Sequence, residues 1–217
     1  SGIALMFNVN LPVNFHSPYK AASISEFWDR WHMTLTRFFT RYVYIPLGGS
    51  RKGTARTLLN IMIIFLLSGF WHGTNWTFLV WGALHGLCMV FERVTGYEKW
   101  KLPHMLKVAW NFMLTTFAWS IFRAESLSQA GQLWNRLFTG GIGKISGQIT
   151  SVFNDTMEIR LLVRMKLLPF LSGHPGMPAV VMTVVLLIAC FFMKNTTQKT
   201  EQMKWNAWTV SYTHLRA

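Results

Sequence analysis

The residue best suited to chemistry is His72, in the stretch Ser68–Trp76 (SGFWHGTNW). The run from Thr57 to Phe91 around it contains no Asp, Glu, Lys or Arg. An imidazole in so apolar a run costs free energy unless it has a partner or a task. Desolvation keeps an imidazole neutral, and a neutral imidazole can act as a general base near pH 7. We therefore favour a catalytic role for His72 over a merely structural one at a helix end.

Small and aromatic residues flank this histidine. Gly69 and Gly73 are expected to clear space beside it, because a missing Cβ lets a ligand approach closely. Trp71 and Trp76 are expected to form an aromatic lining. Asn75 carries an amide that could orient an imidazole or the backbone. Trp71 and Asn75 are accordingly predicted to bind substrate.

A second candidate is His32, which follows Arg30 and Trp31 in the sequence. A lone histidine in such an aromatic, basic segment most simply serves as an anchor. Paired with His72 it gains interest, because reactions that pass through an oxyanion need both a base and a group that stabilises the developing charge. His72 and His32 are thus the predicted catalytic residues, with Arg30 and Trp31 as substrate-binding neighbours. The sequence does not show whether the two histidines meet.

Other chemistry-bearing patterns are weaker. His85 is also flanked by small residues, and a core histidine bonded to a neighbouring helix is the simpler interpretation; a haem site shared with His72 is a distant alternative. No metal site is predicted, since Cys88 and Cys190 are far apart and lie in apolar runs. The chain has no G-x-S-x-G motif, which disfavours a serine hydrolase of the usual type.

Composition indicates a membrane protein. The chain is 51% hydrophobic and 13% charged, against roughly a quarter charged in soluble domains. Uncharged runs cover Thr57–Phe91, divisible into two passes by a turn at Gly73–Asn75, together with Val108–Phe122 and Met177–Met193. We therefore predict an all-α, polytopic integral membrane protein with about four spanning helices plus interfacial or re-entrant helices.

The net charge of +13 is best explained by the membrane. Basic residues gather beside the apolar runs, at 51–56, at 93–107 and at 194–204, whereas the Gly73–Asn75 turn has none. This alternation places the basic loops in the cytoplasm, next to anionic headgroups, and the turn on the other side. The lipid bilayer is the predicted partner of these charges, and binding to nucleic acid is not predicted.

One amphipathic helix is expected from about Glu26 to Tyr42, after N-cap serines. Arg30, Arg37 and Arg41 would share one face of it, opposite a set of aromatic residues. Such a helix fits the membrane interface or a re-entrant element inside the protein.

The chain ends suggest how it is bounded. It begins like the tail of an earlier helix, so we expect a C-terminal portion of a longer protein that lacks N-terminal helices. Residues 1–210 are predicted to form a single membrane-embedded domain. Residues 211–217 (SYTHLRA) resemble a translated sequencing adapter and are expected to be a foreign tail.

Two segments resemble the membrane-bound O-acyltransferase family. They are Ser25–Leu35 (SEFWDRWHMTL) with Tyr44–Gly49 (YIPLGG), and Leu67–Thr77 (LSGFWHGTNWT); Phe117–Glu125 (FAWSIFRAE) adds to them. The resemblance is strongest to the alginate-type bacterial branch and covers about Ser1–Phe138.

The resemblance implies a multi-pass helical fold with a tunnel to a buried histidine in the bacterial inner membrane. It makes His72 the essential histidine and His32 the second active-site position. It implies acyl transfer, typically acetyl, from a cytoplasmic thioester such as acetyl-CoA to a hydroxyl, with no bound cofactor. In the alginate-type branch the acetyl group passes to a periplasmic partner protein and then to a polysaccharide acceptor.

Three alternatives stay open. Transfer of D-alanyl groups to teichoic acid belongs to a related branch of the same family. A transporter with His72 lining a pore would predict more charged residues within the membrane than the apolar runs contain. A haem-binding membrane anchor would show visible absorption.

Overall fold

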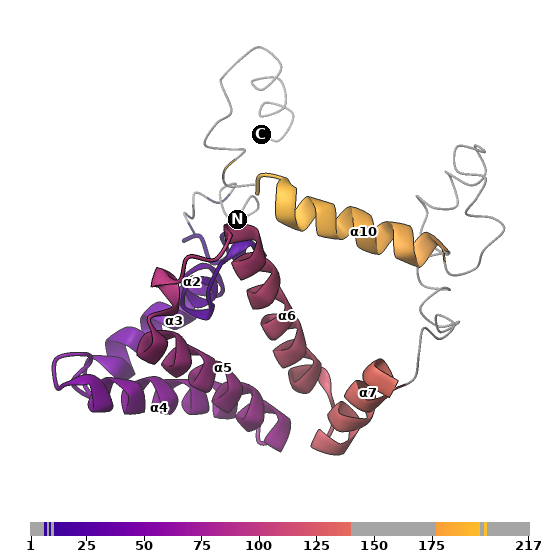
Figure 1. Cartoon of the computed structure of the whole chain (residues 1–217). Coiled ribbons are helices and arrows are strands. Elements are labelled where there is room, and N and C mark those ends of the chain that lie inside the picture. Colours follow the sequence, from indigo (N-terminus) through magenta and orange to yellow (C-terminus); the bar gives the residue numbers. More distant parts are fainter. Residues whose placement is uncertain (1–6, 8, 10, 140–176, 196–197, 199–217) are drawn as a thin grey trace, which may run out of the picture. The chain divides into compact units, whose positions relative to one another are not determined.

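The computed structural model describes residues 7, 9, 11–139, 177–195 and 198. These residues form helices and turns without a strand, which confirms the all-helical class (Figure 1). In chain order the elements are η1 (Pro18–Lys20), α2 (Ile24–Arg30), α3 (Met33–Phe39), the π-helix η2 (Thr40–Tyr44), α4 (Thr54–His72), α5 (Trp76–Thr95), η3 (Tyr97–Lys99), α6 (His104–Arg123), α7 (Leu127–Thr139) and α10 (Met177–Phe192).

The chain divides into two compact units. The first contains residues up to Ala130 and those from Lys194 onward, and the second contains Gly131–Met193. Both candidate catalytic histidines and all the elements from η1 to α6 belong to the first unit. The predicted foreign tail at 211–217 lies outside the described residues.

Helices α4 and α5 form an antiparallel pair joined by the turn at Gly73–Asn75, as the sequence predicts (Figure 1). Both are long and apolar enough to cross a membrane. The other two predicted spans also form helices, but α6 is less apolar and α10 is shorter. Within the described residues the structure thus supports two spanning helices, and the expected number of about four is not established.

Glycines set the close approach of α4 and α5. A Cβ on Gly82 would lie 2.3 Å from the carbonyl oxygen of Phe65, and one on Gly69 would lie 2.4 Å from that of Phe78. Backbone atoms cannot move aside as side chains can, so only glycine fits at these positions. The expectation that Gly69 and Gly73 open space for a ligand is therefore wrong: Gly69 meets the backbone of α5, and a Cβ on Gly73 would meet the ring of Phe78.

The helix expected over Glu26–Tyr42 is broken in two places. Its first part, α2, ends at Arg30, and α3 begins after His32, which has the left-handed backbone φ of 46°. The π-helical turn η2 then follows α3. Because the helical period is interrupted on both sides of α3, Arg30, Arg37 and Arg41 do not lie on one continuous face. The expectation of a single amphipathic helix is wrong at His32.

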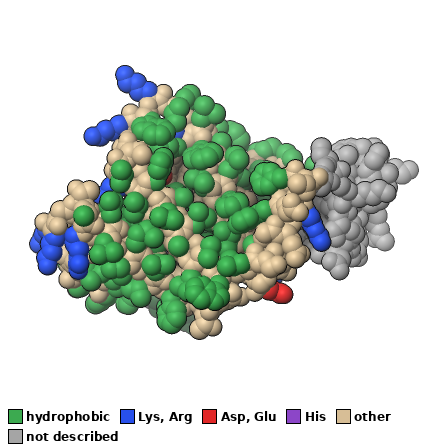
Figure 2. All heavy atoms as spheres, turned by 60° about the horizontal axis from the view of Figure 1, so that its bottom comes forward, with side chains coloured by type: hydrophobic (Ala, Val, Ile, Leu, Met, Phe, Trp, Pro, Cys, Tyr) green, Lys and Arg blue, Asp and Glu red, His purple; other side chains and the backbone are tan. Residues whose placement is uncertain are grey.

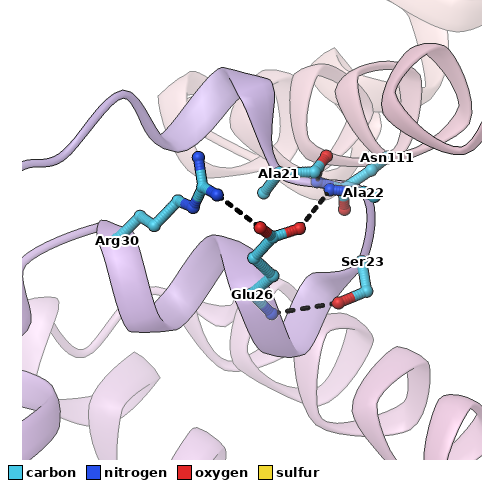
Figure 3. A network of polar contacts seen from close by, with 6 residues as sticks. All are labelled: Ala21, Ala22, Ser23, Glu26, Arg30 and Asn111. Carbon is cyan, nitrogen blue, oxygen red and sulfur yellow. Dashed lines mark hydrogen bonds and ion pairs between the residues drawn. The ribbon is translucent and has the colours of Figure 1, made fainter. Parts of the chain in front are cut away.

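Polar contacts fasten the start of α2 from within the segment (Figure 3). The hydroxyl oxygen of Ser23 accepts a hydrogen bond from the backbone N–H of Glu26 at 3.0 Å. The Glu26 carboxylate accepts one from the N–H of Ala22 at 2.6 Å and also forms an ion pair with Arg30. These contacts satisfy backbone donors that a helix start leaves unpaired.

Two further side chains hold α2 from other helices. Glu92, near the end of α5, accepts hydrogen bonds from the backbone N–H groups of Ile24 at 2.6 Å and Ser25 at 3.0 Å. Asn111 of α6 donates to the carbonyl oxygen of Ala21 at 2.9 Å. The short helix α2 is therefore positioned by α5 and α6 rather than by its own length.

Hydrophobic side chains cover much of the outer surface. Figure 2 shows a face on which they predominate, with Lys and Arg side chains at its margins. Large apolar residues on α4, α5 and α6 are more than half exposed, among them Phe70, Leu87, Phe91, Leu106 and Met113. Such a surface fits contact with lipid or with further protein rather than with water.

Candidate active site

His72 is the last residue of α4, and its half-buried ring lies among aromatic side chains. The rings of Trp81 and Phe122 meet it edge to face, with centroids 5.3 and 5.0 Å away. Trp71 meets it in the same way at 5.0 Å, and Phe78 lies at 6.3 Å. This enclosure comes from three helices, α4, α5 and α6, so their packing fixes the position of His72.

His32 approaches the same region from the break between α2 and α3. The structure links the two predicted catalytic residues through intervening aromatic side chains. His32 lies 6.0 Å from Phe15, Phe15 lies 5.0 Å from Trp31, and Trp31 lies 5.0 Å from Trp119. Trp119 then packs against the aromatic cluster around His72, 5.8 Å from Trp81 and 5.5 Å from Phe122.

The left-handed backbone of His32 is held by the preceding segment. The carbonyl oxygen of Asn14 accepts a hydrogen bond from the N–H of Met33 at 3.0 Å, and the N–H of His16 donates to the carbonyl oxygen of Arg30 at 2.9 Å. A left-handed non-glycine residue costs roughly 1–2 kcal/mol. Such strain gathers at functional sites, where surrounding contacts maintain it.

The other predicted substrate-binding residues differ in their surroundings. Trp31 is partly buried and packs between Phe27, at 5.6 Å in a stacked arrangement, and Trp119. Arg30 is engaged by its ion pair with Glu26. Trp31 therefore lies on the line of rings between the two histidines, whereas Arg30 is committed to the start of α2.

Trp71 and Asn75 lie at the outer end of the α4–α5 pair. Trp71 is 61% exposed and touches His72 only through its ring edge. The Asn75 side chain caps α5 by accepting from the N–H of Thr77 and donates to the carbonyl oxygen of Glu125 at 2.7 Å. The amide of Asn75 thus already joins the α4–α5 turn to the end of α6, and binding of substrate by either residue stays a prediction.

His85 is a core histidine bonded to a neighbouring helix, as expected. Its Nδ1 accepts a hydrogen bond from the indole N–H of Trp28 at 3.3 Å, and the residue is 2% exposed. The rings of Phe27 and Phe65 lie nearly parallel to it, and Trp81 separates it from His72. This dense packing gives His85 a structural role, and a catalytic role for His72 and His32 stays a prediction.

Sequence reasoning missed the indoles that surround the site. The N–H groups of Trp81 and Trp119 are buried and have no hydrogen-bond partner within the described residues. Trp81 lies four residues before His85, and Trp119 lies one turn before Phe122, in runs interpreted simply as spans. The high tryptophan content of these runs was a signal that could have pointed to the aromatic lining. No spacing in the sequence, however, indicates that α6 packs against His72.

A pocket of about 610 Å³ opens beside this site, between the α2–α3 segment and the α4–α5 pair. One end is lined by charged groups near the end of α5, including Arg93, Lys99 and Glu92. The pKa of Asp29, which also lines the pocket, is raised by burial and by the neighbouring carboxylates of Glu26 and Glu98.

The other end of the pocket is apolar and approaches His72. Its lining there includes Trp28, Phe65 and Ser68. Ser68 lies one turn before His72 on α4, about 6 Å along the helix axis. The pocket therefore extends along α4 to within one turn of His72, but neither His72 nor His32 lines it.

Two membrane-length helices and an imidazole enclosed by aromatic rings, with no strand in the described part of the chain, fit a helical membrane protein. Residues 2–127 match the model of MBOAT, the membrane-bound O-acyltransferase family. The chain belongs to this family.

Relatives agree with this assignment. The chain is 35% identical to the peptidoglycan O-acetyltransferase of Helicobacter pylori, over 94% of this chain and 39% of that protein. It is 39% identical to the probable alginate O-acetylase of Pseudomonas putida, over 74% of this chain and 34% of that protein. A teichoic acid D-alanyltransferase of Bacillus subtilis is 27% identical over 57% of this chain and 35% of its own length. The chain spans between a third and two fifths of the length of these relatives.

Proposed function

We propose that the full-length protein is an O-acetyltransferase that moves an acetyl group from a thioester donor toward a polysaccharide hydroxyl, with His72 as the general base. The observation that carries the proposal is the position of His72 at the end of α4, enclosed by aromatic rings of α4, α5 and α6, in a chain of this family. The names of two relatives, a peptidoglycan O-acetyltransferase and a probable alginate O-acetylase, support an acetyl donor and a polysaccharide acceptor.

The proposed chemistry uses both imidazoles. A ring nitrogen of His72 takes the proton of the acceptor hydroxyl while its oxygen attacks the thioester carbonyl carbon. The carbonyl electron pair moves to oxygen, and His32 orients the donor or stabilises this oxyanion. Collapse then breaks the C–S bond, and the proton on His72 passes to the departing thiolate. The products are an ester and a free thiol.

The pocket supports access for the donor from the basic end of the α4–α5 pair. Arg93 and Lys99 carry positive charge suited to the phosphates of a coenzyme A thioester, and the pocket reaches Ser68, one turn before His72. Three carboxylates, those of Asp29, Glu92 and Glu98, line the same pocket and oppose this attraction. By this proposal the basic loops face the cytoplasm of a bacterium, and the acetyl group crosses the inner membrane to a partner protein outside.

The direct test replaces His72 by Ala in the full-length protein. With labelled acetyl-CoA and inverted membrane vesicles, transfer of label to polymer should fall by about 10²- to 10⁴-fold, because the general base is lost. His104→Ala, at an exposed histidine that begins α6, is the matched control and should leave transfer unchanged. Normal transfer by His72→Ala, with equal protein in the membrane, would contradict the assignment.

A second candidate is D-alanyl transfer, which the likeness to the teichoic acid D-alanyltransferase favours. The same vesicles, supplied with a D-alanyl thioester in place of acetyl-CoA, distinguish the two. Faster transfer of D-alanine than of acetyl would replace the donor in the proposal while retaining His72 as the base.

A further inference from the structure

The side chains of Asn14, Thr34 and His32 form a polar contact line beside the helix break. The side-chain oxygen Oδ1 of Asn14 lies 3.0 Å from the backbone nitrogen of Thr34 and 2.9 Å from its hydroxyl oxygen Oγ1. The same hydroxyl oxygen lies 3.5 Å from Nδ1 of His32. None of the three residues belongs to a helix interior, and the long-range partner, Asn14, comes from the segment before η1.

The direction of each hydrogen bond follows from donor counting. The backbone N–H of Thr34 can only donate, so the atom of Asn14 that meets it is the carbonyl oxygen and not the amide nitrogen. That oxygen can only accept, so the single hydroxyl hydrogen of Thr34 is donated to Asn14. The Thr34 oxygen then has only lone pairs to offer to His32. Its contact with Nδ1 is a hydrogen bond only when Nδ1 carries the proton.

We propose that Asn14 and Thr34 are positioning residues that hold His32 as the Nδ1-protonated tautomer and leave its Nε2 as a hydrogen-bond acceptor in the site. Within the described residues, Nε2 of His32 has no hydrogen-bond partner. The effect of this tautomer on catalysis rests on the proposed function, because both concern the same site.

The tautomer decides between the two roles open to His32. A neutral imidazole that carries its proton on Nδ1 cannot donate a hydrogen bond from Nε2 to an oxyanion. It can accept one from an O–H or N–H of a bound substrate. His32 in its neutral form therefore orients a substrate rather than stabilising the oxyanion, and the charge that develops on oxygen is met by other donors.

The tautomer is tested without any activity measurement. Full-length protein with ¹⁵N-labelled histidine is studied by NMR at about pH 8.5, where histidine is ordinarily neutral, and the His32 signals are identified by their loss in His32→Gln. Nδ1 should show the shift of a protonated ring nitrogen and Nε2 that of an unprotonated one. Thr34→Val should reverse this pattern, and Thr34→Ser should keep it. An Nε2-protonated His32 in the parent protein, or no change in Thr34→Val, would overturn the inference.

Activity gives the second readout. Thr34→Val should lower kcat of acetyl transfer by at least about tenfold, as loss of a histidine's orienting partner does, and Thr34→Ser should restore it. Thr95→Val removes an equivalent hydroxyl that bonds only within α5 and serves as the control. Full activity of Thr34→Val would overturn the positioning role. If the parent protein moves no acetyl group, the proposed function fails, while the tautomer is still decided by the NMR spectrum.

Discussion

The two histidines are carried by regions built in opposite ways. His72 ends α4, a regular helix packed against α5 through glycines at backbone contact distance. His32 occupies a break between two seven-residue helices, held by hydrogen bonds from distant segments. Helices of that length are not stable alone, so the position of His32 depends on its tertiary contacts. One region therefore supplies rigidity by close packing, and the other supplies an irregular backbone maintained by polar partners.

The largest effect is expected from disturbing the close-packed pair. Gly82→Val would place side-chain atoms against the carbonyl of Phe65, where even a Cβ lies at 2.3 Å. We expect destabilisation near or above the upper end of the roughly 1–3 kcal/mol seen for overpacking. The measurement is the midpoint of thermal unfolding of the full-length protein in detergent.

Gly131→Ala is the matched control for this substitution. A Cβ at Gly131 would meet nothing within 4 Å, and the residue lies in α7. Alanine there should raise stability by up to about 1 kcal/mol, because glycine is the poorer helix former. Equal midpoints for the two variants would contradict the view that glycines set the α4–α5 distance.

A smaller, local loss of stability is expected in the α2–α3 segment, which polar contacts hold in place. Glu92→Gln removes one of the two carboxylate oxygens that accept from Ile24 and Ser25 and so loses about 1 kcal/mol. Hydrogen exchange should quicken in α2 and α3 while α4 and α5 stay protected. Glu125→Gln, at an exposed side chain after α6, is the control. Uniform loss of protection across all four helices would show that the two regions are not separately held.

The same contrast explains what the sequence could predict. The long apolar runs and the Gly73–Asn75 turn predicted α4 and α5, because the length of an apolar run and the position of a glycine can be read from the local sequence. His72 stood out for the same reason. The break at His32 had no such signal, since no glycine or proline marks it and the contacts that hold it come from Asn14 and His16, earlier in the chain. The glycines were noticed, but whether they face a ligand or a helix depends on tertiary packing.

A stability difference of similar size, confined to one residue, tests the strained backbone at His32. His32 has a φ of 46°, which glycine adopts freely and alanine does not. His32→Ala should lose about 1 kcal/mol of stability relative to His32→Gly, because only the alanine variant retains the left-handed cost. Both variants remove the imidazole, so acetyl transfer should fall equally in both. If His32→Gly is instead the less stable variant in thermal unfolding, the extra chain entropy that glycine loses on folding outweighs the left-handed cost, and backbone strain at His32 is not a significant part of the stability of this region.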